Sequence, residues 1–168
     1  MFPYVVGTAA LAIIIVELYR TPDQEFGTAS PWFRVLRPLP FIIVAAISII
    51  VAGRAPRGRH SFSIDLSLAR EDLARSMTKV PHLRSIAVIF LLAVIAFGVN
   101  RLLIAFGATM LVGVGWELAE ATVIGHYGRL ADLLPNLVSG LVSLALIAGL
   151  RWLVLHRATQ RSASEQAG

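Results

Sequence analysis

The sequence predicts an all-α fold, a polytopic transmembrane helical bundle of about five spans with one interfacial amphipathic helix. Three observations lead to this fold class. Hydrophobic residues make up 57% of the chain and charged residues only 15%, whereas soluble domains carry more charge. The hydrophobic residues gather in five runs that are separated by polar or turn-forming residues. The mean hydropathy of +0.74 is typical of an integral membrane protein.

Each apolar run is interpreted as one membrane crossing. The expected spans are residues 3–19, 35–53, 85–99, 102–124 and 131–155. The third run is short, because a helix needs roughly 20 apolar residues to cross the hydrocarbon core. Asn100 and Arg101 follow it directly, so an alternative is one longer helix and a broken or re-entrant piece over 85–124, with four crossings in total. In either case residues 1–157 are predicted to form a single transmembrane domain.

The connection at residues 54–84 is expected to lie outside the hydrocarbon core. Ser63 or Asp65 is suited to cap a helix that runs to about Thr78. One apolar stripe on that helix would be formed by Leu66, Ala69, Leu73 and Met77. We therefore predict an amphipathic helix at the membrane interface, with a docking site for a partner protein as the alternative. Residues 158–168, rich in Ser, Ala and Gln, are predicted to form a disordered tail.

The charge pattern indicates the class of partner. The formal net charge is +5, and the basic residues lie in segments that flank the apolar runs. Such residues suit the anionic headgroups of lipids better than nucleic acid. Membrane lipids and other membrane protein subunits are therefore the expected partners, and nucleic acid is not. We expect a bacterial inner (cytoplasmic) membrane protein, whose orientation stays open because the basic residues divide about evenly between the two sides.

Polar residues near the ends of the last two expected spans form the candidate site. An ionisable group at bilayer depth is costly unless it faces a protein interior, a partner or water, so such groups indicate function. The candidate ligand-binding residues are Glu117, Glu120, His126, Arg129, Asp132 and Asn136. Helical spacing predicts two stripes, formed by Thr109, Gly113, Glu117 and Glu120 and by Asp132, Asn136, Ser139, Gly140 and Ser143. Because the connection is short, the two helices are expected to be antiparallel neighbours whose stripes face each other.

Three physical roles are open for these residues. In the first, Glu117, Glu120 and Asp132 coordinate a hard divalent cation through oxygen atoms, so that a divalent cation is the candidate cofactor. In the second, the repulsion between carboxylates in a low-dielectric environment favours one of them holding a proton, which suits binding or transport of a polar amphipathic molecule. In the third, the cluster is structural, with Glu117 or Asp132 paired to Arg129 or Arg101 and Asn136 bridging helices.

The segment from Trp116 to Gly140 resembles a known family. Its order of Glu117, Asp132, Asn136 and Gly140 is similar to the C-terminal signature of VanZ-like membrane proteins, with Glu120 in place of that family's Gln. The paired Glu residues before an Asp are also similar to the YjdF-type inner-membrane family. The VanZ-like resemblance implies a small polytopic membrane protein, associated in one case with glycopeptide-antibiotic resistance. It implies no particular reaction.

The sequence contains no recognisable catalytic motif. The chain has no Gly-rich phosphate loop, no HExxH helix and no nucleophile elbow, so the sequence leaves open whether the protein is an enzyme. The expected function is binding or handling of a lipid-linked or amphipathic molecule through an acidic intramembrane site. The alternative is a non-catalytic membrane scaffold, or accessory subunit, that assembles with other membrane proteins.

Overall fold

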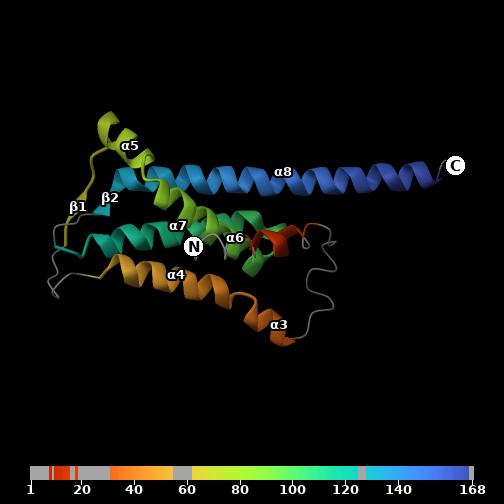
Figure 1. The fold of residues 1–168 in the computed structure, drawn as a ribbon, viewed down its shortest axis with the longest axis horizontal. Helices are drawn as coiled ribbons and strands as arrows, with labels where there is room; N and C mark the ends of the chain where they lie inside the picture. The colour runs from red at the N-terminus through yellow and green to blue at the C-terminus, as the bar shows by residue number, and fades with distance from the viewer. Residues whose placement is uncertain are drawn as a thin grey trace.

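A computed structural model describes residues 8, 10–15, 18, 31–54, 62–124 and 128–166, and it confirms the all-α class (Figure 1). The helices are α3 (Pro31–Leu36), α4 (Leu39–Ala52), α5 (Arg70–Met77), α6 (Val80–Phe97), α7 (Leu102–Glu120) and α8 (Leu133–Gln166). Two short 3-10 helices, η2 (Val99–Arg101) and η3 (Leu130–Asp132), precede α7 and α8. There are also two two-residue strands, β1 (Ile64–Asp65) and β2 (Gly128–Arg129), and the described residues between 8 and 18 are helical.

The chain is an integral membrane protein. Three helical segments in the described ranges are long and apolar enough to cross a bilayer: Val80–Phe97, Val99–Glu120 and Leu130–Gln160. By contrast, the 14 residues of α4 extend about 21 Å, which is less than the roughly 30 Å of a hydrocarbon core. The expected first span, 3–19, lies largely outside the described residues. The prediction of about five spans is therefore not confirmed.

The third and fourth expected spans are two separate helices. Gly98 ends α6 with a φ of 91°, a backbone conformation that glycine adopts without steric cost, and η2 then leads into α7. The single longer helix considered for 85–124 is therefore wrong. The expected start at residue 85 is also wrong, because α6 begins at Val80. Pro81 occupies the first turn of α6, where a missing backbone N–H costs no hydrogen bond, so the helix reaches 18 residues.

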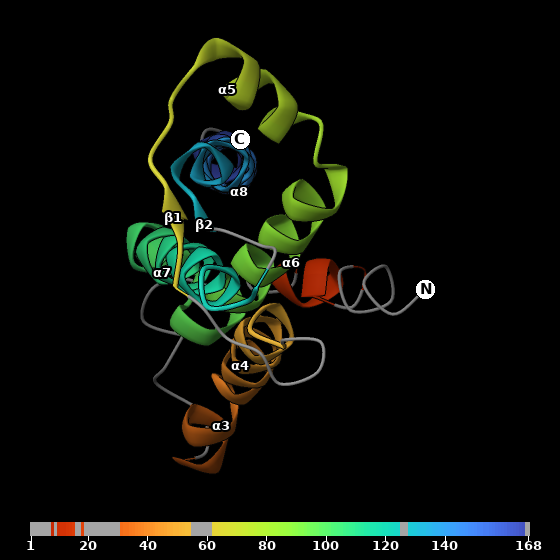
Figure 2. The same ribbon diagram turned by 90° about the vertical axis from the view of Figure 1, so that its left-hand side faces the viewer.

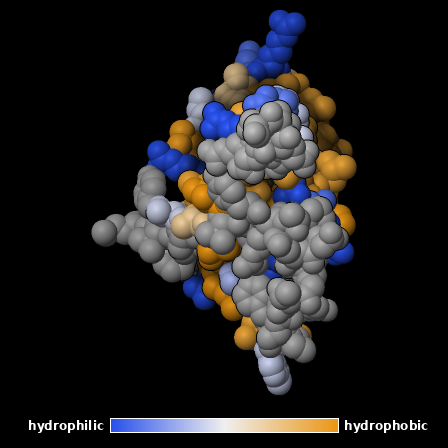
Figure 3. All heavy atoms as spheres, turned by 90° about the vertical axis from the view of Figure 1, so that its right-hand side faces the viewer, coloured by the Kyte–Doolittle hydropathy of each residue, from blue (hydrophilic) through white to orange (hydrophobic). Residues whose placement is uncertain are grey.

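Three layers make up the bundle. α6 and α7 form the middle layer and pack against α8 on one side and α4 on the other (Figure 2). Their contact buries a core that includes Phe90, Val94 and Ala105. Large apolar side chains on the outer faces remain exposed, among them Ile43, Ile47, Leu111, Leu141 and Leu146, and the end view of Figure 3 shows hydrophobic side chains on both flanks. A lipid environment accommodates such a surface, whereas water does not.

The predicted amphipathic helix is much shorter than expected. Residues 62–69 contain the strand β1 and no helix, β1 pairs in parallel with β2, and only α5 is helical. The Asp65 carboxylate accepts a hydrogen bond from the Ser67 backbone N–H at 2.9 Å, and the Ser67 hydroxyl donates to Asp72 at 2.7 Å. Short polar side chains that bind nearby backbone in this way compete with a helix. As a result, β1 and α5 arch around the start of α8 (Figure 2).

The predicted disordered tail is helical as far as it is described. α8 continues from Leu133 to Gln166, because its last turns contain Ala, Arg, Gln and Glu and no Pro or Gly. Its 34 residues extend about 51 Å at 1.5 Å per residue, well beyond the hydrocarbon thickness. The C-terminal part of α8 accordingly projects past the other helices (Figure 1).

Gly128 lies where a side chain does not fit. A Cβ atom at this position would lie 2.5 Å from the carbonyl oxygen of Glu117, so β2 would have to move away from α7. We expect Gly128→Ala to lower the free energy of unfolding by about 1–3 kcal/mol, the usual effect of overpacking. Gly149→Ala is the matched control, because nothing lies within 4 Å of the Cβ it would add. Thermal unfolding followed by circular dichroism in detergent measures both; equal stability of the two variants would contradict the close approach.

Candidate functional site

Glu117 is the buried centre of the site. It lies in the last turn of α7 with 6% of its surface exposed. Its Oε2 accepts a hydrogen bond from the backbone N–H of Arg129 at 3.3 Å, because β2 passes across the end of α7. Its Oε1 is also buried and has no hydrogen-bond partner among the described residues. A carboxyl oxygen in that position is an acceptor available to a donor that reaches it.

Asn136 lies on the facing helix, against Gly113, one turn before Glu117 on α7. It is 3% exposed, and a Cβ atom added to Gly113 would lie 3.0 Å from its Nδ2. The predicted stripes therefore meet at Gly113 and Asn136. Two other members of the α8 stripe face elsewhere, because Asp132 binds Ser76 and Lys79 and the Ser139 hydroxyl donates to the Leu83 carbonyl. The Oδ1 of Asn136 is a second buried acceptor without a partner in the described part of the chain. Two neighbouring helices thus each present one unpaired acceptor oxygen.

Asp132 is engaged elsewhere. Its carboxylate accepts a hydrogen bond from the Ser76 hydroxyl at 2.5 Å and forms a salt bridge with Lys79. Its side chain is only 2% exposed. Sequence reasoning missed both partners, although Lys79 is the single lysine of the chain and directly precedes an apolar run. The predicted arginine partners do not fill this role for Asp132, whose ion pair links α5 and α6 to the start of α8.

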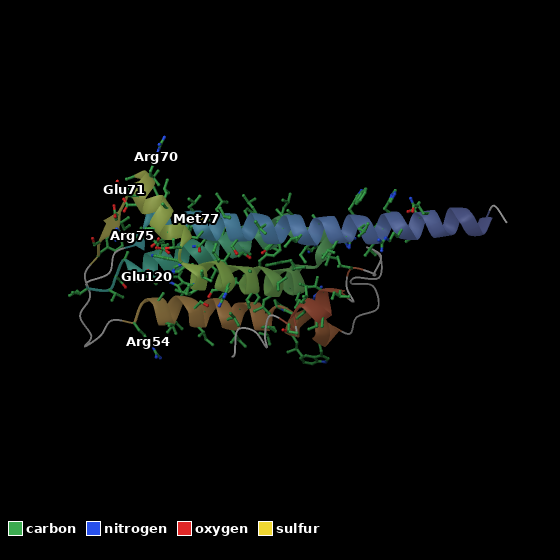
Figure 4. All side chains as sticks on the ribbon, turned by 45° about the horizontal axis from the view of Figure 1, so that its top comes forward. Arg54, Arg70, Glu71, Arg75, Met77 and Glu120 are labelled. Carbon is green, nitrogen blue, oxygen red and sulfur yellow. The ribbon has the colours of Figure 1, made fainter. Side chains whose placement is uncertain are left out.

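The remaining candidates are more peripheral. Glu120 is half-buried and accepts a hydrogen bond from the Trp116 indole N–H at 2.7 Å. Figure 4 shows Glu120 at the same end of the bundle as Arg54, Arg70 and Arg75. His126 lies outside the described residues.

A pocket adjoins Glu117. It has a volume of about 200 Å³ and is bounded by β1, β2, α7, η3 and the start of α8. Apart from Glu117, Gly128 and Arg129, its lining is apolar and consists of Ile64, Leu66, Val114, Leu118, Leu130 and Leu133. Leu66 was predicted on a helical stripe and instead belongs to the extended segment that covers the pocket. The accessible surface of the pocket is almost wholly apolar, and the Glu117 carboxylate is buried beside it.

The positions of Glu117, Glu120 and Asp132 decide whether these three carboxylates can bind one divalent cation together. Within the described ranges, no group of three His, Asp or Glu side chains is placed to hold a metal ion. Asp132 is occupied by Lys79 and Ser76, and Glu120 by Trp116, which leaves Glu117 as a single carboxylate beside the pocket.

Comparisons with models of protein families, with curated proteins and with solved structures gave no match. Function is therefore inferred from the site itself, where chemistry depends on particular residues more than on fold.

Removing Lys79 isolates the buried carboxylate of Asp132. We expect Lys79→Met to lower the free energy of unfolding by about 2–4 kcal/mol, because an uncompensated charge stays buried. The double variant Lys79→Met, Asp132→Asn recovers part of this loss, since neither charge remains. Arg75→Met on α5 is the control, because Arg75 is exposed. Denaturant unfolding of wild type, Lys79→Met, Asp132→Asn and the double variant gives the coupling energy, and purely additive effects would count against a stabilising ion pair.

Proposed function

We propose that this protein binds an amphipathic or lipid-linked molecule in the pocket beside Glu117. One observation carries the proposal: a mostly apolar pocket adjoins a buried carboxyl oxygen that has no donor in the described part of the chain. Ligand sites are commonly apolar cavities with a few placed polar groups. The proposal includes residence in a bacterial inner membrane and kinship with VanZ-like proteins. The order of Glu117, Asp132 and Asn136 supports that kinship.

The headgroup of the ligand is inferred from hydrogen-bond chemistry. Glu117 Oε1 accepts hydrogen bonds, so it selects a group that donates them. A buried acceptor left unpaired costs about 1–3 kcal/mol, and an ammonium or hydroxyl group of a ligand removes that cost at Glu117. A headgroup with N–H or O–H donors therefore fits better than one with acceptors alone.

The tail of the ligand is inferred from the walls. Leu66 is 71% exposed, Leu118 49% and Ile64 42%, although all three line the pocket. An alkyl chain covering them removes apolar surface from the interfacial region, where water is present, at about 25 cal/mol per Å². The pocket lies at the end of α7, which we expect near the membrane surface. A ligand held there has its head at Glu117 and its chain toward the lipid.

Two dodecyl amphiphiles test the donor requirement. Dodecylammonium and dodecyltrimethylammonium carry the same charge and chain, but only the first has N–H donors. We expect wild-type protein to bind dodecylammonium about tenfold more tightly, the effect of one hydrogen bond to a charged group. Glu117→Gln is expected to abolish this preference. Native mass spectrometry in mild detergent measures the adducts.

Glu120→Gln is the matched control for this experiment. It removes the same charge from the same helix, but Glu120 is bonded to Trp116 and does not line the pocket. The preference for dodecylammonium is expected to persist in this variant. Equal binding of the two amphiphiles by wild type, or an equal loss in both Glu variants, would contradict a donor-selective site at Glu117.

A membrane scaffold is the second candidate function. It is favoured by the C-terminal part of α8, which ends beyond the other helices (Figure 1) and exposes Trp152, Leu153 and Leu155. In that case the protein would co-purify with another membrane subunit. Truncation after Arg151 would release that subunit while leaving amphiphile binding unchanged.

A further inference from the structure

We propose that the opposite end of the bundle holds the headgroup of one anionic phospholipid, between η2 and α8. The site is independent of the pocket at Glu117. Its residues are Asn100 and Arg101 from η2 and Arg151 from α8. They line a second pocket of about 390 Å³ together with apolar residues at the start of α7.

Arg151 is positioned with one donor group left over. Its Nη2 donates a hydrogen bond to Oδ1 of Asn100, which fixes the guanidinium against η2. Its Nη1 is buried and has no hydrogen-bond partner among the described residues. A guanidinium carries donors in a planar fork that matches phosphate oxygens. A phosphate in the pocket would therefore receive the donor that the protein leaves unpaired.

Two basic residues line the pocket. They are Arg101 and Arg151, and among the described residues no acidic side chain lines it. The first turn of α7 contains no acidic residue, and its N-cap makes no side-chain hydrogen bond. The positive end of the helix dipole attracts anions, and at the start of α7 it adds to the charge of two arginines. This arrangement favours a headgroup with net negative charge over a zwitterionic one.

The depth of the pocket identifies the anion as a lipid. Asp132 and Arg151 are separated along α8 by about 28 Å, at 1.5 Å per residue, which is close to the hydrocarbon thickness of a bilayer. With Asp132 near one surface, Arg151 lies at the level of the phosphates on the other. Leu103 and Ile104 line the same pocket and are 76% and 53% exposed, so acyl chains can lie against them. Basic pockets between spanning helices are known to hold anionic lipid headgroups.

Native mass spectrometry with two lipids tests the site. Wild-type protein in mild detergent is titrated with phosphatidylglycerol and with phosphatidylcholine that has the same acyl chains. We expect one phosphatidylglycerol to bind with clear preference. Each arginine near a membrane surface contributes about 1 kcal/mol, so Arg151→Gln and Arg101→Gln should each weaken phosphatidylglycerol binding about fivefold. Neither should change the binding of phosphatidylcholine.

Arg157→Gln is the matched control, because Arg157 is an exposed arginine further along α8 that does not line the pocket. Its effect should be less than twofold. Arg101→Gln keeps the bond between Arg151 and Asn100, so it tests the site even if Arg151→Gln fails to fold. Equal affinity of wild type for the two lipids would overturn the proposal. So would an equal loss in Arg157→Gln, because that would indicate attraction by net charge alone.

Discussion

The ion pair between Lys79 and Asp132 is the interaction on which the site end of the bundle depends. It joins the turn between α5 and α6 to the first residues of α8, and Ser76 adds a second bond to the same carboxylate. With α5 held there, the preceding extended segment lies across the end of α7 and pairs β1 with β2. That pairing brings the Arg129 N–H to Glu117 and places Ile64 and Leu66 over the pocket. The buried Asp132 carboxylate therefore helps to position Ile64, Leu66 and the Arg129 N–H, although it contacts none of them.

Polar contacts also close the opposite end. The Arg37 side chain is buried and its Nε donates to the carbonyl oxygen of Ile95, in the last turn of α6. Carbonyls in a last turn have no partner within their own helix, so a guanidinium is well suited to this position. Arg151 and Asn100 make a comparable tie between α8 and η2. Between the two ends, the described helices contact one another mainly through apolar side chains. Polar bonding is concentrated where the membrane surfaces are expected.

The predictable part of the structure is the part governed by helical periodicity. Spacing alone placed Gly113 and Asn136 on facing stripes, and apolar length alone identified α7 and α8 as spanning helices. The partner of Asp132 was not predictable, because Lys79 lies far away in sequence and on a helix end whose direction depends on tertiary packing. The pairing of β1 with β2 was also not predictable, because a strand of two residues is too short to show the alternation of apolar and polar residues that identifies strands. The hydrogen bonds of Ser67 with Asp65 and Asp72 favour an extended segment before α5 over a helix. The spacing of apolar residues carries no information about such side-chain hydrogen bonds.

The three carboxylates of the candidate site differ in the hydrogen-bond donors that contact them. Asp132 is neutralised by a cation and a hydroxyl, and Glu120 is bonded to an indole on its own helix. Glu117 receives one backbone N–H on one oxygen, and the close approach of Gly128 to α7 fills the space beside its carbonyl oxygen with backbone. A cation site would need several of these carboxylates to converge, whereas the fold separates them by giving two of them partners. What remains is one acceptor oxygen beside apolar walls, an arrangement that favours a single donor group on a hydrophobic chain.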